Sequence, residues 1–387
     1  MLSVFRLARK SLGRTVIALS ALALAACEPV ALSGTGPGAS RGGPVPVALL
    51  VPAGSGQAND EALARSLENA ARLAIADLGP GAIDLRVYRT AGQPSRAAVE
   101  AARAVDEGAQ VILGPVFAAE ANAAGVAVAQ RGVNVLSFSN NTDIAGGNVF
   151  VLGQTFRNTA SRLAQYAVRN NAGQIMVVYD QNAAGNTGRA AIEAGVRQAG
   201  GTVAGAQGYE FSQNGITQAA PRIAQATRDA GANAVFLTAG SDGALPLVSQ
   251  LLRENGLSNE RFIGLTRWDI PAATLSLPGV QGGWFAQPDP GLYGQYVSRY
   301  QGAYGVAPHP ISGLAYDGIA AIGALAKRGD APTAQALTQG SGFAGVGGVF
   351  RLLRDGSNER GLAVAQITNN QVTVIDPAPR SFGGAGF

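Results

Sequence analysis

The stretch from Val111 to Phe138, VILGPVFAAEANAAGVAVAQRGVNVLSF, contains the alternation that decides the fold. Val111 to Leu113 predicts a short buried strand, because three apolar residues stand between a polar residue and a glycine. Ala119 to Arg131 has the length of a helix, and Val133 to Phe138 predicts the next strand. A strand, a helix and a second strand in this order are typical of βα units around a parallel sheet.

The same alternation continues on both sides of this unit. It begins at Val45 to Val51, restarts after Asn148 to Leu152, and ends with a strand at Arg261 to Leu265. The helices predicted between these points span residues 59–78, 95–107, 156–170, 187–199, 216–230 and 244–255, and the other strands span 84–88, 174–179, 202–209 and 234–238. About 340 folded residues exceed what one hydrophobic core usually holds. We therefore expect an α/β protein with two Rossmann-like lobes, each built on a parallel sheet and joined by a hinge.

The C-terminal part predicts further helices and strands. The predicted helices are Gly291 to Tyr304 and Ser312 to Lys327. Gly348 to Leu353 and Leu362 to Thr368 predict a strand pair that turns at Asp355-Gly356, a dipeptide typical of hairpins. Val372 to Ile375 predicts a third strand, and residues 377–387 have the Pro- and Gly-rich composition of a frayed tail.

The N-terminus has the pattern of a bacterial lipoprotein signal. Four basic residues precede the apolar run Thr15 to Ala26, which is too short to span a bilayer. Leu24-Ala25-Ala26-Cys27 places the single cysteine after small residues, so the thiol of Cys27 would carry a lipid and hold the mature protein on a membrane. The alternative is a plain secretory signal with an incidental cysteine. Glu28, which follows the cysteine, resembles an outer-membrane address, so we expect a lipid-anchored periplasmic protein on the outer membrane.

Composition excludes several classes of function. The chain has 29 basic and 25 acidic residues, and subtracting the four basic residues of positions 1–26 leaves 25 of each sign. A near-neutral mature chain has no global field to attract nucleic acid, so no nucleic-acid partner is expected. With Cys27 acylated and His309 as the single histidine, we expect no disulfide, no metal site and no cofactor. Residues 28–44 are rich in Gly, Pro, Ser and Ala and predict a flexible tether.

Several short motifs occur in a characteristic order along the chain. They are SLENAA at Ser66–Ala71 with AIAD at Ala74–Asp77, VILGP at Val111–Pro115, VNVLSFS at Val133–Ser139, AYD at Ala315–Asp317, and FAGVGGVFR at Phe343–Arg351 with Asp355-Gly356. In this order and spacing the chain resembles the type I periplasmic binding fold, best known from the branched-chain amino acid receptors of ABC transporters. The resemblance covers nearly the whole chain after the signal.

The resemblance implies two lobes built from discontinuous segments, three crossovers between them and a ligand held in the cleft. A signal peptide at 1–26 and a tether at 27–44 would precede lobe 1 at 45–152 plus 286–340, with lobe 2 at 153–285 plus 341–376 and a tail at 377–387. The loops at the carboxyl ends of the strands would line the cleft, where helix N-termini offer free N–H groups. The candidate ligand-binding residues are Ser55, Phe117, Ser139, Asn140, Asn141, Thr142, Asp180, Asn182, Asp242, Trp268 and Asp269.

These loops depart from those of amino acid receptors. Val116-Phe117-Ala118-Ala119 stands where such receptors commonly offer serine, Asn141 falls near an expected hydroxyl, and Ala183-Ala184-Gly185 lacks a common tyrosine. The residues that would clamp an amino acid are therefore largely replaced. Ser, Asn and Asp after strands also cap helices and form turns, and Trp268 and Trp284 are equally typical of a core.

Two further segments, LTRWD at Leu265–Asp269 and LPGVQGGWFAQPDP at Leu277–Pro290, resemble penicillin-binding-protein activator lipoproteins. That resemblance implies a non-enzymatic activator of a peptidoglycan synthase, and the synthase would be the protein partner. The sequence predicts no helical-repeat domain of the kind that enteric activators carry. The alternative is a solute-binding receptor that delivers an amino acid or a related small molecule to an ABC permease.

A hydrolase is the third class considered. Ala239-Gly240-Ser241-Asp242-Gly243 nearly matches the nucleophile elbow, and Asp269 or Asp289, then His309, follow in the order of hydrolase triads. The first glycine of the elbow is replaced, and His309 stands between two prolines. We therefore expect no enzymatic activity.

Overall fold

The structure is a computed structural model that describes residues 43–383. The predicted signal peptide, Cys27, nearly all of the predicted tether and residues 384–387 lie outside the described residues. Within 43–383, no helix combines the length and apolarity needed to cross a membrane.

The first lobe is built on a five-stranded parallel sheet, sheet A, in the order β2-β1-β3-β4-β5. Its strands are β1 (Val45–Val51), β2 (Ile83–Arg89), β3 (Val111–Leu113), β4 (Asn134–Ser137) and β5 (Val149–Val151). Its helices are α2 (Ala58–Leu78), α3 (Pro94–Asp106), α4 (Ala118–Val128), α9 (Pro290–Tyr304), α10 (Gly313–Arg328) and the short α11 (Ala334–Leu337). The parallel sheet that the apolar runs predict is confirmed.

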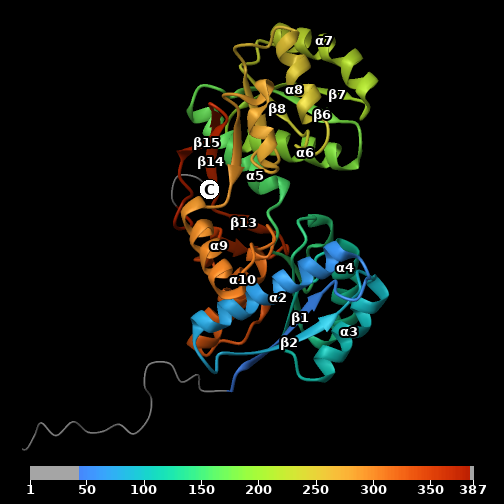
Figure 1. Ribbon diagram of the computed structural model, residues 1–387, viewed down its shortest axis with the longest axis vertical. Coiled ribbons are helices and arrows are strands. Elements are labelled where there is room, and N and C mark those ends of the chain that lie inside the picture. Colours follow the sequence, from blue (N-terminus) through green and yellow to red (C-terminus); the bar gives the residue numbers. More distant parts are fainter. Residues whose placement is uncertain (1–42, 384–387) are drawn as a thin grey trace, which may run out of the picture. The chain divides into compact units, whose positions relative to one another are not determined.

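Alternate residues of β1 enter two different cores of this lobe. Val47 and Leu49 pack with α2, α9 and α10, whereas Ala48 and Leu50 pack with α3 and α4. Side chains of successive strand residues point to opposite faces, so a strand that is covered on both faces is apolar throughout. Figure 1 shows α3 and α4 together on one side of sheet A and α2 and α10 on the other.

The second lobe is built on a seven-stranded sheet, sheet B, in the order β15-β14-β10-β9-β8-β6-β7. Its strands are β6 (Gln174–Asp180), β7 (Thr202–Tyr209), β8 (Ala234–Leu237), β9 (Arg261–Gly264), β10 (Trp284–Gln287), β14 (Ala363–Thr368) and β15 (Gln371–Asp376). Helices α5 (Phe156–Arg169) and α6 (Ala183–Gln198) cover one face, and α7 (Gln213–Asp229) and α8 (Leu245–Glu254) cover the other. Sheet B is parallel except where β14 pairs with β10 and β15.

A small antiparallel sheet, sheet C, corrects the predicted strand pair. It contains β11 (Phe343–Gly345), β12 (Gly348–Leu352) and β13 (Asn358–Arg360). The predicted turn at Asp355-Gly356 is confirmed, but β12 pairs with β13 across it, whereas the predicted partner becomes β14 of sheet B. The short turn brings the next three residues, Asn358–Arg360, back to pair with β12. The chain then passes to the second lobe, where β14 joins sheet B.

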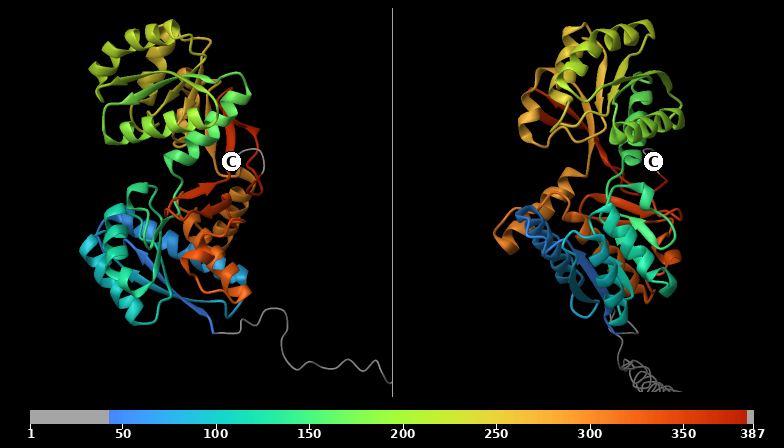
Figure 2. Two further views of the ribbon diagram at one scale, coloured as in Figure 1. Left: turned by 180° about the vertical axis from the view of Figure 1, so that it is seen from behind. Right: turned by 90° about the vertical axis from the view of Figure 1, so that its right-hand side faces the viewer.

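The packing of sheet C also differs from the predicted lobe boundary at residue 341. Phe343, Phe350 and Leu352 lie in the core that contains α2 and α10, so this segment packs with the first lobe. Only from β14 onwards does the chain join sheet B. Figure 2 shows the red C-terminal strands in both places, one group beside the orange helices and one within sheet B.

Three segments of chain pass between the lobes. The first, residues 152–155, joins β5 to α5; the second, Pro288 and Asp289, joins β10 to α9; the third, residues 361–362, joins β13 to β14. Asn358 Nδ2 donates to the carbonyls of Val151 and Gly153 at 2.7 and 2.9 Å, which binds β13 to the first crossover. The strand that leads into the third crossover is therefore hydrogen-bonded to the first crossover.

Candidate functional site

A pocket of about 550 Å³ is lined from both lobes at the carboxyl edge of sheet A and the start of α6. We call it the asparagine pocket. Its lining includes Asn140, Asn141, Thr142 and Asp143 from the first lobe, and Ala183, Ala184 and Thr187 from the second. Three of the predicted site residues, Asn140, Asn141 and Thr142, thus lie together.

The first-lobe side of this pocket is a loop held by its own side chains. Ser139 Oγ accepts a hydrogen bond from Asn141 N at 3.1 Å, and Asn141 Oδ1 accepts one from Asp143 N at 2.9 Å. Asn140 is exposed, and its side chain makes no hydrogen bond within residues 43–383. The loop is therefore fixed by Ser139 and Asn141, while Asn140 offers its amide to the pocket.

The second-lobe side is the N-terminus of α6. This helix begins at Ala183, four residues before the predicted start, because Asn182 caps it by accepting from Gly185 N at 2.8 Å. Asn182 is thus a cap beside the pocket. The backbone N–H groups of Ala183 and Ala184 belong to the first turn, where a helix has no internal acceptors for them. They form a donor surface opposite Asn140.

Asp180 is buried, and both of its carboxylate oxygens accept hydrogen bonds from neighbouring side chains. Tyr209 Oη donates to Asp180 Oδ1, and Thr238 Oγ1 donates to Asp180 Oδ2 at 3.3 Å. Burial, with the hydrogen bond to Asp180, raises the pKa of Tyr209, so this phenol stays protonated. Asp180 therefore ties the ends of β6, β7 and β8 together, a structural role that the sequence interpretation did not include.

Three other predicted residues lie outside the pockets described here. Ser55 Oγ accepts from Gln57 N at 3.1 Å within a turn. Phe117 is 39% exposed at the start of α4, and Asp242 is exposed in the loop before α8. The structure therefore does not bring these three side chains to the asparagine pocket.

Trp268 is a core residue, which corrects its prediction as a cleft residue. It is fully buried in the cluster formed by β8, β9, α7 and α8, and its indole lies against Gly264 and Gly283. Trp284 and Phe285 are buried as well. The tryptophans of the two segments that resemble activator lipoproteins therefore pack the second lobe, and neither presents its ring at the surface.

Asp269 pairs with Arg267 beside a second pocket. Arg267 Nε donates to Asp269 Oδ1 at 2.9 Å, and its Nη2 donates to Oδ2. Arg267 lines a cavity of about 180 Å³, here called the hinge pocket, together with Gln154, Pro288 and Leu362 from the three crossovers. Arg267 was part of a motif in the sequence but was not proposed as a site residue.

Arg360 and Asp317 form a buried ion pair at the hinge pocket. Arg360 Nη1 lies 3.0 Å from Asp317 Oδ2, and these two side chains are only 8% and 2% exposed. Arg360 Nε donates to Leu152 O at 2.8 Å, and Asp317 Oδ1 accepts from Val346 N at 2.8 Å. Burial raises the pKa of Asp317, while Arg360 and Val346 N–H oppose that shift. Both residues line the hinge pocket.

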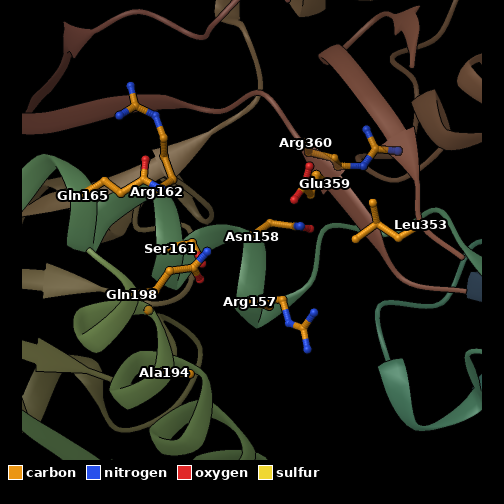
Figure 3. A pocket seen from close by; sticks show the side chains of 11 residues that line it. Arg157, Asn158, Ser161, Arg162, Gln165, Ala194, Gln198, Leu353, Glu359 and Arg360 are labelled. Atoms are coloured by element: carbon orange, nitrogen blue, oxygen red, sulfur yellow. The ribbon is translucent and has the colours of Figure 1, made fainter. Parts of the chain in front are cut away.

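A third pocket lies between α5, α6 and sheet C and is lined by polar residues. Arg157, Arg162 and Arg360 contribute to it, yet Figure 3 shows their guanidinium groups pointing in three different directions. Arg162 Nε donates to Leu362 O at 2.7 Å, and Arg162 also pairs with Asp376 at 2.9 Å. These arginines therefore bind the protein's own chain and do not converge on a common point.

The residues considered for a hydrolase triad have other partners. Ser241 Oγ donates to Ile270 O, and His309 Nδ1 accepts from Ile311 N at 3.4 Å. A nucleophile–base hydrogen bond between Ser241 and His309 is not formed within the described residues. Residues 43–383 also hold no cluster of three or more His, Cys, Asp or Glu side chains suited to a metal ion.

Two parallel-sheet lobes, three crossovers and a pocket lined from both lobes define a type I periplasmic binding fold. The family model of the periplasmic binding proteins matches residues 44–371, so the chain belongs to that family. None of the curated protein sequences matches this chain.

Solved structures show the same fold at low sequence identity. A putative branched-chain amino acid ABC transporter protein from Rhodospirillum rubrum is 19% identical, with a TM-score of 0.72 over 86% of this chain and 100% of that one. The leucine-binding protein from Thermotoga maritima is 19% identical, with a TM-score of 0.58 over 86% and 98% of the two chains. An ABC transporter substrate-binding protein from Desulfitobacterium hafniense, solved with Leu, is 18% identical, with a TM-score of 0.63 over 86% and 99%.

Proposed function

We propose that this protein is a periplasmic receptor that binds a small solute between its two lobes and delivers it to an ABC permease. The observation that carries the proposal is the asparagine pocket, because it is lined from both lobes. A ligand that contacts both lobes stabilises one arrangement of them, and a permease can recognise that arrangement. Family membership and the named neighbours support a receptor more strongly than the activator interpretation.

The activation of a peptidoglycan synthase has less support. It rests on the sequence resemblance of Leu265–Asp269 and Leu277–Pro290, and the aromatic residues of these segments are buried. Buried side chains stabilise the lobe and leave no aromatic anchor for a partner at these positions. The receptor is therefore the function that we put to test.

Binding to the asparagine pocket should depend on Asn140 and Asn141. A panel of amino acids and small peptides is screened by thermal unfolding, since a ligand at 100 times its Kd adds about 2.7 kcal/mol of stability. For any ligand found, N140A/N141A should weaken binding at least about tenfold, the loss expected from one or two hydrogen bonds. N214A, which removes an exposed amide on α7, serves as the matched control. Unchanged affinity in N140A/N141A would remove this loop from the ligand site.

The lipid anchor at Cys27 is a separate proposal, supported by the signal pattern of residues 1–27. In cells of the source organism, the wild-type chain should sediment with membranes and carry a diacylglyceryl mass at its N-terminus. C27A should lose that mass and move to the soluble periplasmic fraction or remain unprocessed. Density separation of the two membranes tests the outer-membrane address. A wild-type chain without lipid mass would leave a plain secretory signal as the explanation.

A further inference from the structure

We propose that the hinge pocket is a second small-molecule site, separate from the asparagine pocket, and that it takes a carboxylate with an apolar body. The inference goes beyond the proposed function, because it adds a site to the one in which we place the receptor's solute. Three features of the hinge pocket carry it: an apolar wall, unpartnered guanidinium N–H groups, and carboxylates that are all paired.

The wall of the hinge pocket is apolar and small. Ile270, Ile311, Leu314, Val346 and Leu362 line it, together with two prolines. Its volume of about 180 Å³ compares with the roughly 150 Å³ of an engineered apolar cavity that binds benzene. The pocket therefore has room for one six-membered ring or a branched aliphatic group of similar size.

Arg360 brings a cationic donor to this apolar pocket. Its guanidinium lies beside Asp317 and Gly347, which both line the pocket, and its side chain is 8% exposed. Nε and Nη1 have partners, but Nη2 is buried with no hydrogen-bond partner within residues 43–383. A buried donor without a partner costs free energy, and a carboxylate oxygen is the acceptor that a guanidinium binds most strongly.

Arg267 supplies a second cation at the same pocket. Its Nε and Nη2 donate to Asp269, whereas its Nη1 makes no hydrogen bond within the described part of the chain. Arg267 comes from the second lobe, and Arg360 is the last residue of β13, directly before the third crossover. A carboxylate bound by either arginine would thus lie where the lobes join.

An amino acid fits the hinge pocket poorly, because its ammonium group would meet no unpaired carboxylate there. Both oxygens of Asp317 are occupied, by Arg360 and by Val346 N–H, and both oxygens of Asp269 accept from Arg267. The other polar side chains of the lining, Gln154 and Tyr293, are neutral. Burying a cation without a compensating charge is costly, so the pocket selects against a zwitterion.

Isothermal titration calorimetry of the purified protein tests this inference. The probes are benzoate and cyclohexanecarboxylate, with L-phenylalanine as the zwitterion and benzyl alcohol as the neutral ring. We expect at least one carboxylate to bind at least tenfold more tightly than both L-phenylalanine and benzyl alcohol. R267Q should weaken the binding of that carboxylate at least tenfold and leave the binding of benzyl alcohol unchanged.

Two further variants control for folding and location. R72Q removes an exposed arginine of α2 that lines neither the hinge pocket nor the asparagine pocket, and it should bind the carboxylates as the wild type does. I311W fills the hinge pocket without changing its charge and should abolish binding. Thermal unfolding of each variant without ligand confirms that it is folded, which is why R267Q is preferred to a change at the more deeply buried Arg360.

The outcomes separate this inference from the proposed function. Tight binding of L-phenylalanine without binding of either carboxylate would leave the receptor standing and overturn the ligand class of the hinge pocket. Carboxylate binding that R267Q and I311W do not change would overturn the hinge pocket as its site. No binding of these probes, together with no thermal shift from the wider panel, would overturn both proposals.

Discussion

W268A should lower the free energy of unfolding by about 3–5 kcal/mol, the cost of removing a large aromatic side chain from a closed core. Trp268 is fully buried, and a Cβ at Gly264 or Gly283 would overlap its indole ring. The surrounding backbone is part of β9 and the loop before β10, so it cannot easily collapse into the vacated space. Chemical denaturation followed by fluorescence or circular dichroism measures the change.

W268F is the matched control for that experiment. Phenylalanine keeps most of the buried ring and removes an indole N–H that has no hydrogen-bond partner within the described residues. Its cost should be less than half that of W268A, because a smaller cavity forms and no unsatisfied donor remains. A loss of under about 1 kcal/mol in W268A would contradict the core role and return Trp268 to the candidate ligand-binding residues.

R360M should destabilise the protein by about 3–5 kcal/mol, because it leaves Asp317 buried without its cation. The variant also loses the hydrogen bond to Leu152 O and the contact of the guanidinium with the Phe350 ring. Since Leu152 belongs to the first crossover, the loss affects the connection between lobes as well as the core of the first lobe. The midpoint of urea unfolding at neutral pH measures it.

The double variant D317N/R360M separates the charge from the packing. The amide that replaces the Asp317 carboxylate is neutral and can still accept from Val346 N–H, so no unpaired charge stays buried. We expect the double variant to be more stable than R360M by at least about 1 kcal/mol, as replacing both members of a buried pair costs less than removing one. If R360M alone lost less than about 1 kcal/mol, the ion pair would be a minor contributor.

The lobes could be predicted from local patterns, because each strand of a covered parallel sheet is apolar along its whole length. Val45–Val51 and Thr202–Tyr209 have in the structure the limits that the sequence predicts. The partner of β12 could not be predicted in this way. Both β13 and β14 follow β12 and could pair with it. The short hairpin brings β13 to β12, so residues 348–353 do not pair with 362–368.

The candidate site was predicted in part. Loops after strands are recognisable, so Asn140, Asn141 and Thr142 could be placed near one another. The rule that residues after strands line the cleft was wrong for Trp268. A side chain after a strand can turn into the core when glycines leave room for it, and Gly264 and Gly283 leave that room for the indole. Arg360 gave no local signal, because its partners Leu152 and Asp317 are 208 and 43 residues away.

The hydrogen bonds that join β13 to the first crossover also constrain the order in which the chain can fold. Asn358 donates to Val151 O across 207 residues, and the core around α2 includes Phe350 and Leu352. An N-terminal fragment that ends before α9 would lack α10 and sheet C, so α2 alone would cover that face of sheet A. Contacts of such sequence separation slow folding, because distant segments must meet before they are stabilised. The first lobe to be synthesised must therefore wait for nearly the last residues of the chain, and until then the part of its apolar face that α2 does not cover is open to chaperones and to aggregation.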